Sequence, residues 1–126
     1  MNQELGSGWT VEIERGPDWL FISLQGCEPF DATGVDFAAR VWHLVEREFV
    51  NRIVLEMDKV PVLPSELIGE IINLHARVTS QGGLMRIAGL SDENFAVLQA
   101  CQLADRFPHY QNRQEAVQGY RPNKPR

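Results

Sequence analysis

The stretch Val60-Pro-Val-Leu-Pro-Ser-Glu-Leu-Ile-Gly69 joins a strand-forming segment to a helix-forming segment, and it decides the fold. The apolar run at residues 53–57 predicts a buried strand, and a helical pattern starts near Ser65, after two prolines. The chain is therefore expected to leave a strand, turn, and enter a helix at a serine. A helix N-terminus presents unpaired N–H groups and the positive end of the helix dipole, which suit a hydroxyl cap or a phosphate.

Upstream of this stretch, the sequence predicts a β-hairpin followed by a helix. Residues 9–14 alternate apolar and polar side chains, residues 19–24 are more continuously apolar, and the turn-forming segment Arg15-Gly-Pro-Asp18 separates them. A helix is expected to start near Asp31 or Thr33, because either side chain can cap it. The apolar face of this helix is expected to contain Phe37, Val41, Leu44, Val45 and Phe49.

Downstream of the stretch, strands and helices continue to alternate. A helix is predicted over residues 65–80, where Gln81-Gly-Gly83 ends it, and a short strand follows at residues 84–88. Ser91 or Asp92 can cap a third helix, in which Phe95, Leu98 and Cys101 are expected to face the core. A weak strand at residues 107–110 and a short helix at residues 113–120 complete the pattern.

These elements predict an α/β fold with one domain. An N-terminal β-hairpin precedes alternating β/α units, which build a mostly parallel sheet of four to five strands covered by about four helices. The domain is expected to extend from residue 9 to residue 119. Residues 1–8 are interpreted as a flexible tail, and residues 120–126 as a disordered basic tail.

The composition narrows the class of partner. The 126 residues carry a net charge of -5, which argues against nucleic acid as a partner because a phosphate backbone requires a basic surface. Neither a signal-peptide pattern nor an apolar run of membrane-spanning length is present, so a cytoplasmic protein without a membrane partner is expected. Cys27 and Cys101 lie in apolar surroundings and are interpreted as buried free thiols.

No pattern in the sequence indicates catalysis. The chain lacks the glycine-rich loops that cradle phosphates, and His43, His75 and His109 do not have the spacing of metal ligands. Cys27 has no evident base beside it. The chain is therefore predicted to be a non-enzyme with no metal, no cofactor and no catalytic residue.

The central stretch and its surroundings resemble the STAS domain, the fold of sulfate transporters and anti-sigma factor antagonists. The family's Asp-Ser-Ser-Gly-Leu-Gly motif, at the start of a helix, aligns with Pro64-Ser65-Glu66-Leu67-Ile68-Gly69. The resemblance covers roughly residues 9–119 and includes, at the family's spacing, Gly26, Phe30-Asp31, Gln81-Gly-Gly83, Ala88-Gly-Leu-Ser91, Leu98 and residues 103–107. Here Pro64 replaces the family's acidic residue, Glu66 its second serine and Leu67 its first glycine.

The resemblance implies a bacterial signalling protein that regulates transcription through protein–protein interaction. In the family, a hydroxyl residue after the motif's acidic residue is phosphorylated by a kinase of the anti-sigma type, and the unphosphorylated form binds that kinase. Carried over by position, Ser65 is the phosphoacceptor candidate, and Pro64, Ser65, Glu66, Leu67, Ile68 and Gly69 form the partner-binding segment. The implied partner is an anti-sigma factor or serine kinase.

The residues themselves leave other interpretations open. In one alternative, Ser65 is simply a helix N-cap that stabilises the helix by about 1 kcal/mol and has no regulatory role. Glu66 can be an ordinary acid in a first helical turn, and Gly69 can allow a helix to pack closely on a sheet. The alternative function is a degenerate STAS domain that acts without phosphorylation, either as a constitutive scaffold, self-association included, or as a small-ligand-binding module.

Overall fold

The computed structural model describes residues 2–6, 9–25, 37–60, 63 and 65–118. Six strands form one sheet in sequence order: β1 (Asn2–Gly6), β2 (Trp9–Arg15), β3 (Leu20–Gln25), β4 (Arg52–Lys59), β5 (Leu84–Ala88) and β6 (His109–Tyr110). The first three strands pair antiparallel, and β3 to β6 pair parallel. The predicted α/β class, the opening hairpin and the mostly parallel sheet are therefore confirmed.

The sixth strand corrects one expectation. The sequence predicts a flexible tail over residues 1–8, but residues 2–6 form β1, which pairs with β2 from Asn2 opposite Glu12 to Gly6 opposite Trp9. The backbone N–H and C=O groups of β2 on that side thereby gain partners. The sheet consequently has one strand more than the upper limit of the predicted range.

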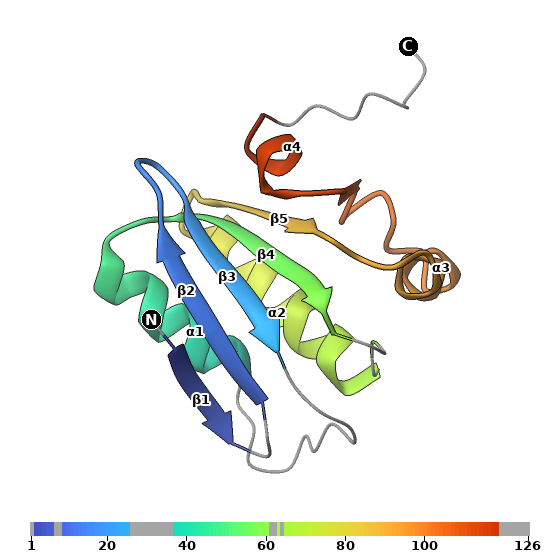
Figure 1. The fold of residues 1–126 in the computed structure, drawn as a ribbon, viewed down its shortest axis with the longest axis horizontal. Helices are drawn as coiled ribbons and strands as arrows, with labels where there is room; N and C mark the ends of the chain where they lie inside the picture. Colours follow the sequence, from blue (N-terminus) through green and yellow to red (C-terminus); the bar gives the residue numbers. More distant parts are fainter. Residues whose placement is uncertain (1, 7–8, 26–36, 61–62, 64, 119–126) are drawn as a thin grey trace.

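Four helices accompany the sheet: α1 (Phe37–Glu48), α2 (Ser65–Ser80), α3 (Asp92–Ala100) and α4 (Arg113–Gln118). Figure 1 shows α1 and α2 together behind the sheet, α3 beyond its β5 side, and α4 near β5. The bounds of α2 and β5 are those predicted. Asp31 and Thr33, the expected caps of the first helix, lie outside the described residues.

The end of α1 differs from its predicted pattern. Val41, Leu44 and Val45 are buried as expected, but Phe49 is 92% exposed. The helix ends at Glu48, and Phe49 takes a left-handed backbone conformation with a φ of 56°. Because the chain turns at that residue, the helical period no longer directs its side chain toward the core.

Apolar side chains are buried on both faces of the sheet. The larger cluster joins the sheet to α1 and α2 and includes Ile22, Leu55, Leu67 and Ile71. A smaller cluster on the opposite face contains Trp19, Val54, Ala88, Tyr110 and Ala116. We find no helix long and apolar enough to cross a membrane in the described part of the chain.

Candidate functional site

The candidate phosphoacceptor, Ser65, is the first residue of α2. The strand that leads to it, β4, has parallel neighbours on both sides, and its chain direction brings residue 59 to the edge where parallel strands end. That edge is where open α/β sheets most often bind ligands and partners. Pro64 lies outside the described residues, as do the side chains of Ser65 and Glu66.

The rest of the predicted partner-binding segment divides into buried and exposed positions. Leu67 and Ile68 are 0% and 7% exposed and belong to the main core, so their side chains fix the helix on the sheet rather than face a partner. Gly69 is exposed, and a Cβ atom built on it would have no described residue within 4 Å. The expectation that Gly69 allows close packing on the sheet is therefore wrong, because the glycine is exposed and no described strand residue lies near it.

A side chain from α3 holds the loop that leads to Ser65. Asn94 is 3% exposed; its Oδ1 accepts a hydrogen bond of 3.0 Å from the Leu63 N–H, and its Nδ2 donates one of 3.1 Å to the Val60 carbonyl. The N–H of Asn94 donates to the Oγ of Ser91, which confirms Ser91 as a cap of α3. We call this arrangement of Asn94 with Val60 and Leu63 the Asn94 clasp.

The clasp was not anticipated from the sequence. Asn94 is the third residue of a helix that begins after a serine cap, where an asparagine is ordinarily a surface residue. Its partners lie 31 and 34 residues away along the chain. The available signal is that Asn94 lies four residues after Leu90 and four before Leu98, at the spacing of one helix face. That spacing does not reveal which backbone groups the amide would bind.

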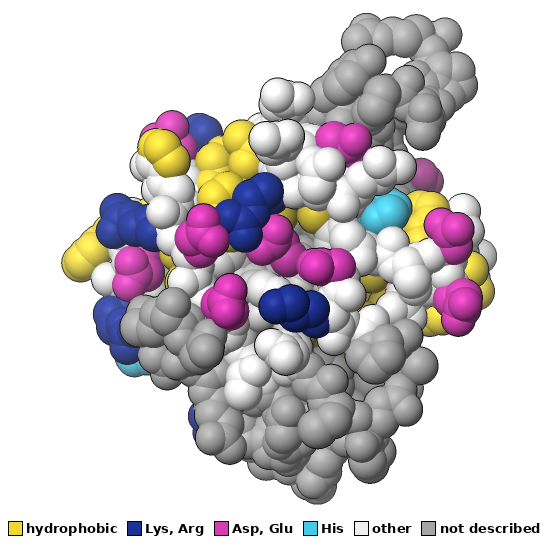
Figure 2. Space-filling model, viewed as in Figure 1, with side chains coloured by type: hydrophobic (Ala, Val, Ile, Leu, Met, Phe, Trp, Pro, Cys, Tyr) yellow, Lys and Arg dark blue, Asp and Glu magenta, His cyan; other side chains and the backbone are white. Residues whose placement is uncertain are grey.

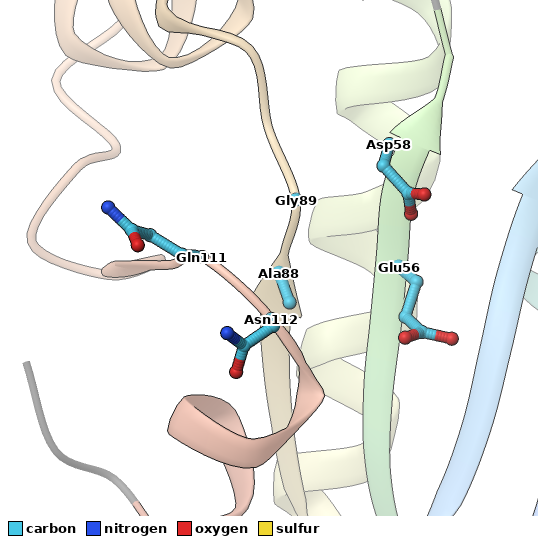
Figure 3. A pocket seen from close by; sticks show the side chains of 6 residues that line it. All are labelled: Glu56, Asp58, Ala88, Gly89, Gln111 and Asn112. Carbon is cyan, nitrogen blue, oxygen red and sulfur yellow. The ribbon is translucent and has the colours of Figure 1, made fainter.

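A small pocket opens near the ends of the parallel strands. It encloses about 170 Å³ and is lined by Glu56, Asp58, Ala88, Gly89, Gln111 and Asn112. Figure 3 shows the two carboxylates projecting from β4 beside Ala88 and Gly89, with Gln111 and Asn112 on the segment that leads into α4. Gly89 has a φ of +78°, and a Cβ on it would lie 3.1 Å from the Cβ of Asp58. The volume is below the roughly 300 Å³ of an ordinary ligand site, so only a small group could enter.

Charged side chains close the sheet face beside this pocket. Arg113 donates from Nε and Nη2 to both carboxylate oxygens of Glu56, at 3.0 and 2.8 Å. Its Nη1 lies 2.9 Å from Glu14, and its guanidinium carbon lies 4.3 Å from the centre of the Phe21 ring. The hydrogen bond that Arg113 donates to Glu56 is the largest cause that raises the pKa of Arg113. In Figure 2, acidic and basic side chains gather over the middle of this face.

His75 packs against an aromatic ring, whereas Cys101 is exposed at the end of a helix. His75 contacts Phe107 edge-on with ring centres 4.9 Å apart, and burial, assisted by Arg106, lowers its pKa. Cys101 is an exposed free thiol, so the prediction that it is buried is wrong; α3 ends at Ala100, and Cys101 follows as its C-cap. Cys27 lies outside the described residues. Within the described ranges, His, Cys, Asp and Glu form no group of three that could hold a metal ion.

Solved structures of other proteins share this fold. TM1081 from Thermotoga maritima is 20% identical, with a TM-score of 0.71 over 86% of this chain and 92% of its own. An anti-sigma factor antagonist from Mycobacterium paratuberculosis is 14% identical, with a TM-score of 0.69 over 90% and 95% of the two chains. Among curated proteins, none matches this chain significantly in sequence.

A third related structure was determined in two states. SpoIIAA, a Bacillus anti-sigma factor antagonist, is 15% identical in its unphosphorylated form, with a TM-score of 0.67 over 88% of this chain and 98% of its own. Its phosphorylated form is 14% identical and has a TM-score of 0.63 over 87% and 99% of the two chains. At these identities the likeness concerns the fold alone. The STAS domain family, however, matches residues 10–116, most of the length of the sequence, and the chain therefore belongs to the STAS domain family.

Proposed function

We propose that this chain is a non-enzymatic regulatory module that binds an anti-sigma factor or serine kinase and is switched by phosphorylation of Ser65. The observation that carries the proposal is the position of Ser65, at the start of α2 and after the central strand of a STAS fold. The same fold occurs in SpoIIAA in phosphorylated and unphosphorylated forms. A cytoplasmic location and a role in bacterial transcription control belong to this proposal.

The start of α2 suits a reversible negative charge. A phosphate carries close to two negative charges at neutral pH, and the free N–H groups of a first helical turn can accept them. Residues 65–80 form four and a half turns of helix, and the apolar face of α2 is anchored by Leu67, Ile71 and Leu74. Phosphorylation at its start can therefore change the surface while the fold is kept. A partner docked at that point would meet the new charge directly.

Gly69 supports a partner surface on the same helix. Residues four apart lie on one helix face, so Gly69 follows Ser65 along the surface of α2. A glycine in a helix interior costs about 1 kcal/mol relative to alanine. Among the described residues we find no packing reason for that cost, because none of them would contact a Cβ atom at Gly69. A partner that approaches the bare backbone closely would supply a reason for the glycine.

The experiment that tests this function compares three baits in a pull-down from the native cell lysate. We expect the wild-type chain and Ser65→Ala to retain an anti-sigma factor or serine kinase, and Ser65→Asp to lose it. The melting temperature of Ser65→Asp should remain within a few degrees of wild type, which separates lost docking from lost folding. Equal capture by Ser65→Asp and wild type would contradict the switch.

Gly69→Ala gives a second, matched test of the surface. We expect this variant to be more stable by about 1 kcal/mol in chemical denaturation, and yet to capture less of the partner. Ala76 is also exposed on α2, so Ala76→Gly is the control; it should lose similar stability and keep full capture. Normal capture by Gly69→Ala would remove Gly69 from the interface.

A constitutive binding module is the second candidate, because the motif lacks its acidic residue and its second hydroxyl. In that case Ser65→Ala and Ser65→Asp should bind the same partner equally well. In the described sheet, β1 pairs only with β2, so its outer edge could also pair with a second copy. Sedimentation at several concentrations tests for self-association through β1. A thermal-shift screen tests whether the 170 Å³ pocket binds a small ligand.

A further inference from the structure

We propose that Asn94 is a positioning residue through which a charge at Ser65 changes the conformation of α3. This inference rests on the proposed role of Ser65 as the switched residue. It assigns a regulatory connection between two elements, the loop before α2 and the helix α3. The surface that a partner senses would then include α3 as well as the start of α2.

The first part of the argument is the closeness of the clasp to Ser65. Leu63, whose N–H donates to the Oδ1 of Asn94, lies two residues before Ser65 in the chain. Val60, whose carbonyl accepts from Nδ2, lies at the other end of the same short loop. Val60 and Leu63 are both 4% exposed, so these two residues are anchored in the core where Asn94 binds them. A shift at Ser65 is therefore transmitted to an anchored segment rather than absorbed by a free one.

The second part is the chemistry of the asparagine. An amide side chain offers one acceptor and one donor group on a single planar unit, and Asn94 presents each to the matching backbone group. Because the amide is buried, it cannot separate from the loop without leaving polar groups unpaired away from water. The loop and the first turn of α3 are therefore expected to move together.

The third part is the sparse attachment of α3. It makes few backbone contacts with the strands and other helices, and its described buried side chains are Asn94 and Leu98. Phe95 adds a tilted contact with His109, with ring centres 5.4 Å apart. A helix held by so few side chains responds readily when one of its attachments is displaced. Among the described residues, Asn94 makes the polar contacts between α3 and the two residues Val60 and Leu63 that precede Ser65.

The test uses two-dimensional ¹H–¹⁵N NMR spectra of the purified full chain and four proteins: wild type, Ser65→Asp, Asn94→Ala and the double variant. We expect Ser65→Asp to shift amide resonances in the first turn of α2 and also in residues 92–100. In the Asn94→Ala background, Ser65→Asp should still shift the α2 resonances but no longer those of α3. Asn73→Ala, which changes an exposed asparagine on α2, is the control and should preserve both sets of shifts.

Amide exchange supplies a readout that a general loss of stability would not reproduce. In Asn94→Ala, we expect the Leu63 amide to exchange roughly tenfold faster relative to amides in the middle of α2, as the loss of one hydrogen bond implies. If Asn94→Ala does not fold, Asn94→Asp replaces it, since a carboxylate keeps the acceptor for Leu63 and lacks the donor for Val60. The same loss of α3 shifts is then expected.

Two results would overturn the inference: no response of α3 to Ser65→Asp in the wild-type background, or an equal response with and without Asn94. No partner protein enters the measurement. A failed pull-down would therefore contradict the proposed function without affecting this result. Conversely, uncoupled spectra would remove Asn94 from the switch while leaving partner capture at Ser65 intact.

Discussion

The two faces of the sheet are covered by helices through different kinds of contact. On the face covered by α1 and α2, the sheet and these helices meet through apolar side chains such as Ile22, Leu55 and Ile71. On the other face, α4 covers a smaller apolar cluster and is held by arginines. Arg113 joins α4 to Glu56 on β4 and Glu14 on β2, and Arg86 on β5 donates to the carbonyls of Ala116 and Val117.

This difference indicates which face carries the stability of the domain. Burial of apolar surface contributes about 25 cal/mol per Å², so the extended α1/α2 contact supplies most of the stabilisation. Six residues of α4 bury little, and the arginines fix where they lie through directional contacts. The α4 face should therefore tolerate substitutions that the α1/α2 face does not.

The largest expected effect is from Leu55→Ala, on the α1/α2 side of β4. Leu55 is 0% exposed, so truncation removes three buried carbon atoms and leaves a cavity, with an expected loss of about 3 kcal/mol. The neighbouring Val54 is also 0% exposed but faces the opposite cluster, and Val54→Ala should cost about 1.5 kcal/mol. Chemical denaturation measures both; equal losses would show that the two faces are packed alike.

Arg113→Ala should have the next largest effect, a loss of about 1.5 kcal/mol. The change leaves Glu56, whose side chain is 15% exposed, without its two hydrogen bonds from the guanidinium. Faster amide exchange across α4, beyond the change in global stability, would show that the helix has been released. Glu14 is 65% exposed, so Glu14→Gln should change stability by less than about 0.5 kcal/mol.

A double replacement tests whether the charged contact between Arg113 and Glu56 itself stabilises the domain. Arg113→Leu combined with Glu56→Leu removes both charges, so no partly buried carboxylate is left unpaired, and the loss should be smaller than for Arg113→Ala. A larger loss in the double variant would mean that the charged contact itself stabilises α4.

The same contrast separates what the sequence could predict from what it could not. The apolar period over residues 65–80 predicted α2 with its observed bounds, because a regular buried stripe is repeated along the helix. The position of Ser65 at a helix start followed from the two prolines and that period. Such features are local, and each can be read from neighbouring residues.

The polar contacts that fix the site are not local. Glu56 and Arg113 are 57 residues apart, and Leu63 and Asn94 are 31 residues apart, so only the folded chain brings them together. Helical periodicity also fails at the point where a helix ends, which explains Phe49. The pattern placed this residue on the buried face of α1, whereas the chain turns one residue after Glu48 and exposes it.

Phe49→Gly should therefore raise stability, by about 1 kcal/mol. The exposed ring gives up little packing, and glycine adopts a left-handed φ of 56° without the cost that a side chain incurs. Gly82→Ala is the matched reverse: its φ is +77° and no described residue would contact the new Cβ, so backbone strain alone should lower stability by a similar amount. Thermal or chemical denaturation compares the two. A loss of stability in Phe49→Gly would indicate that the ring packs in solution.

The smallest expected effect is a change in pH dependence caused by His109, next to the α4 face. Burial lowers its pKa, although Asp92 and Glu115 oppose that shift, and its Nε2 is buried without a hydrogen-bond partner among the described residues. Below a pH of about 6.5 the unfolded chain binds a proton that the folded chain resists, so stability falls as the pH is lowered from that value. His109→Phe should therefore reduce the slope of unfolding free energy between about pH 7 and pH 5. His75, whose pKa burial also lowers, should leave a residual slope. An unchanged slope in His109→Phe would mean that the histidine is protonated equally in both states, and that this side of the sheet opens enough to hydrate it.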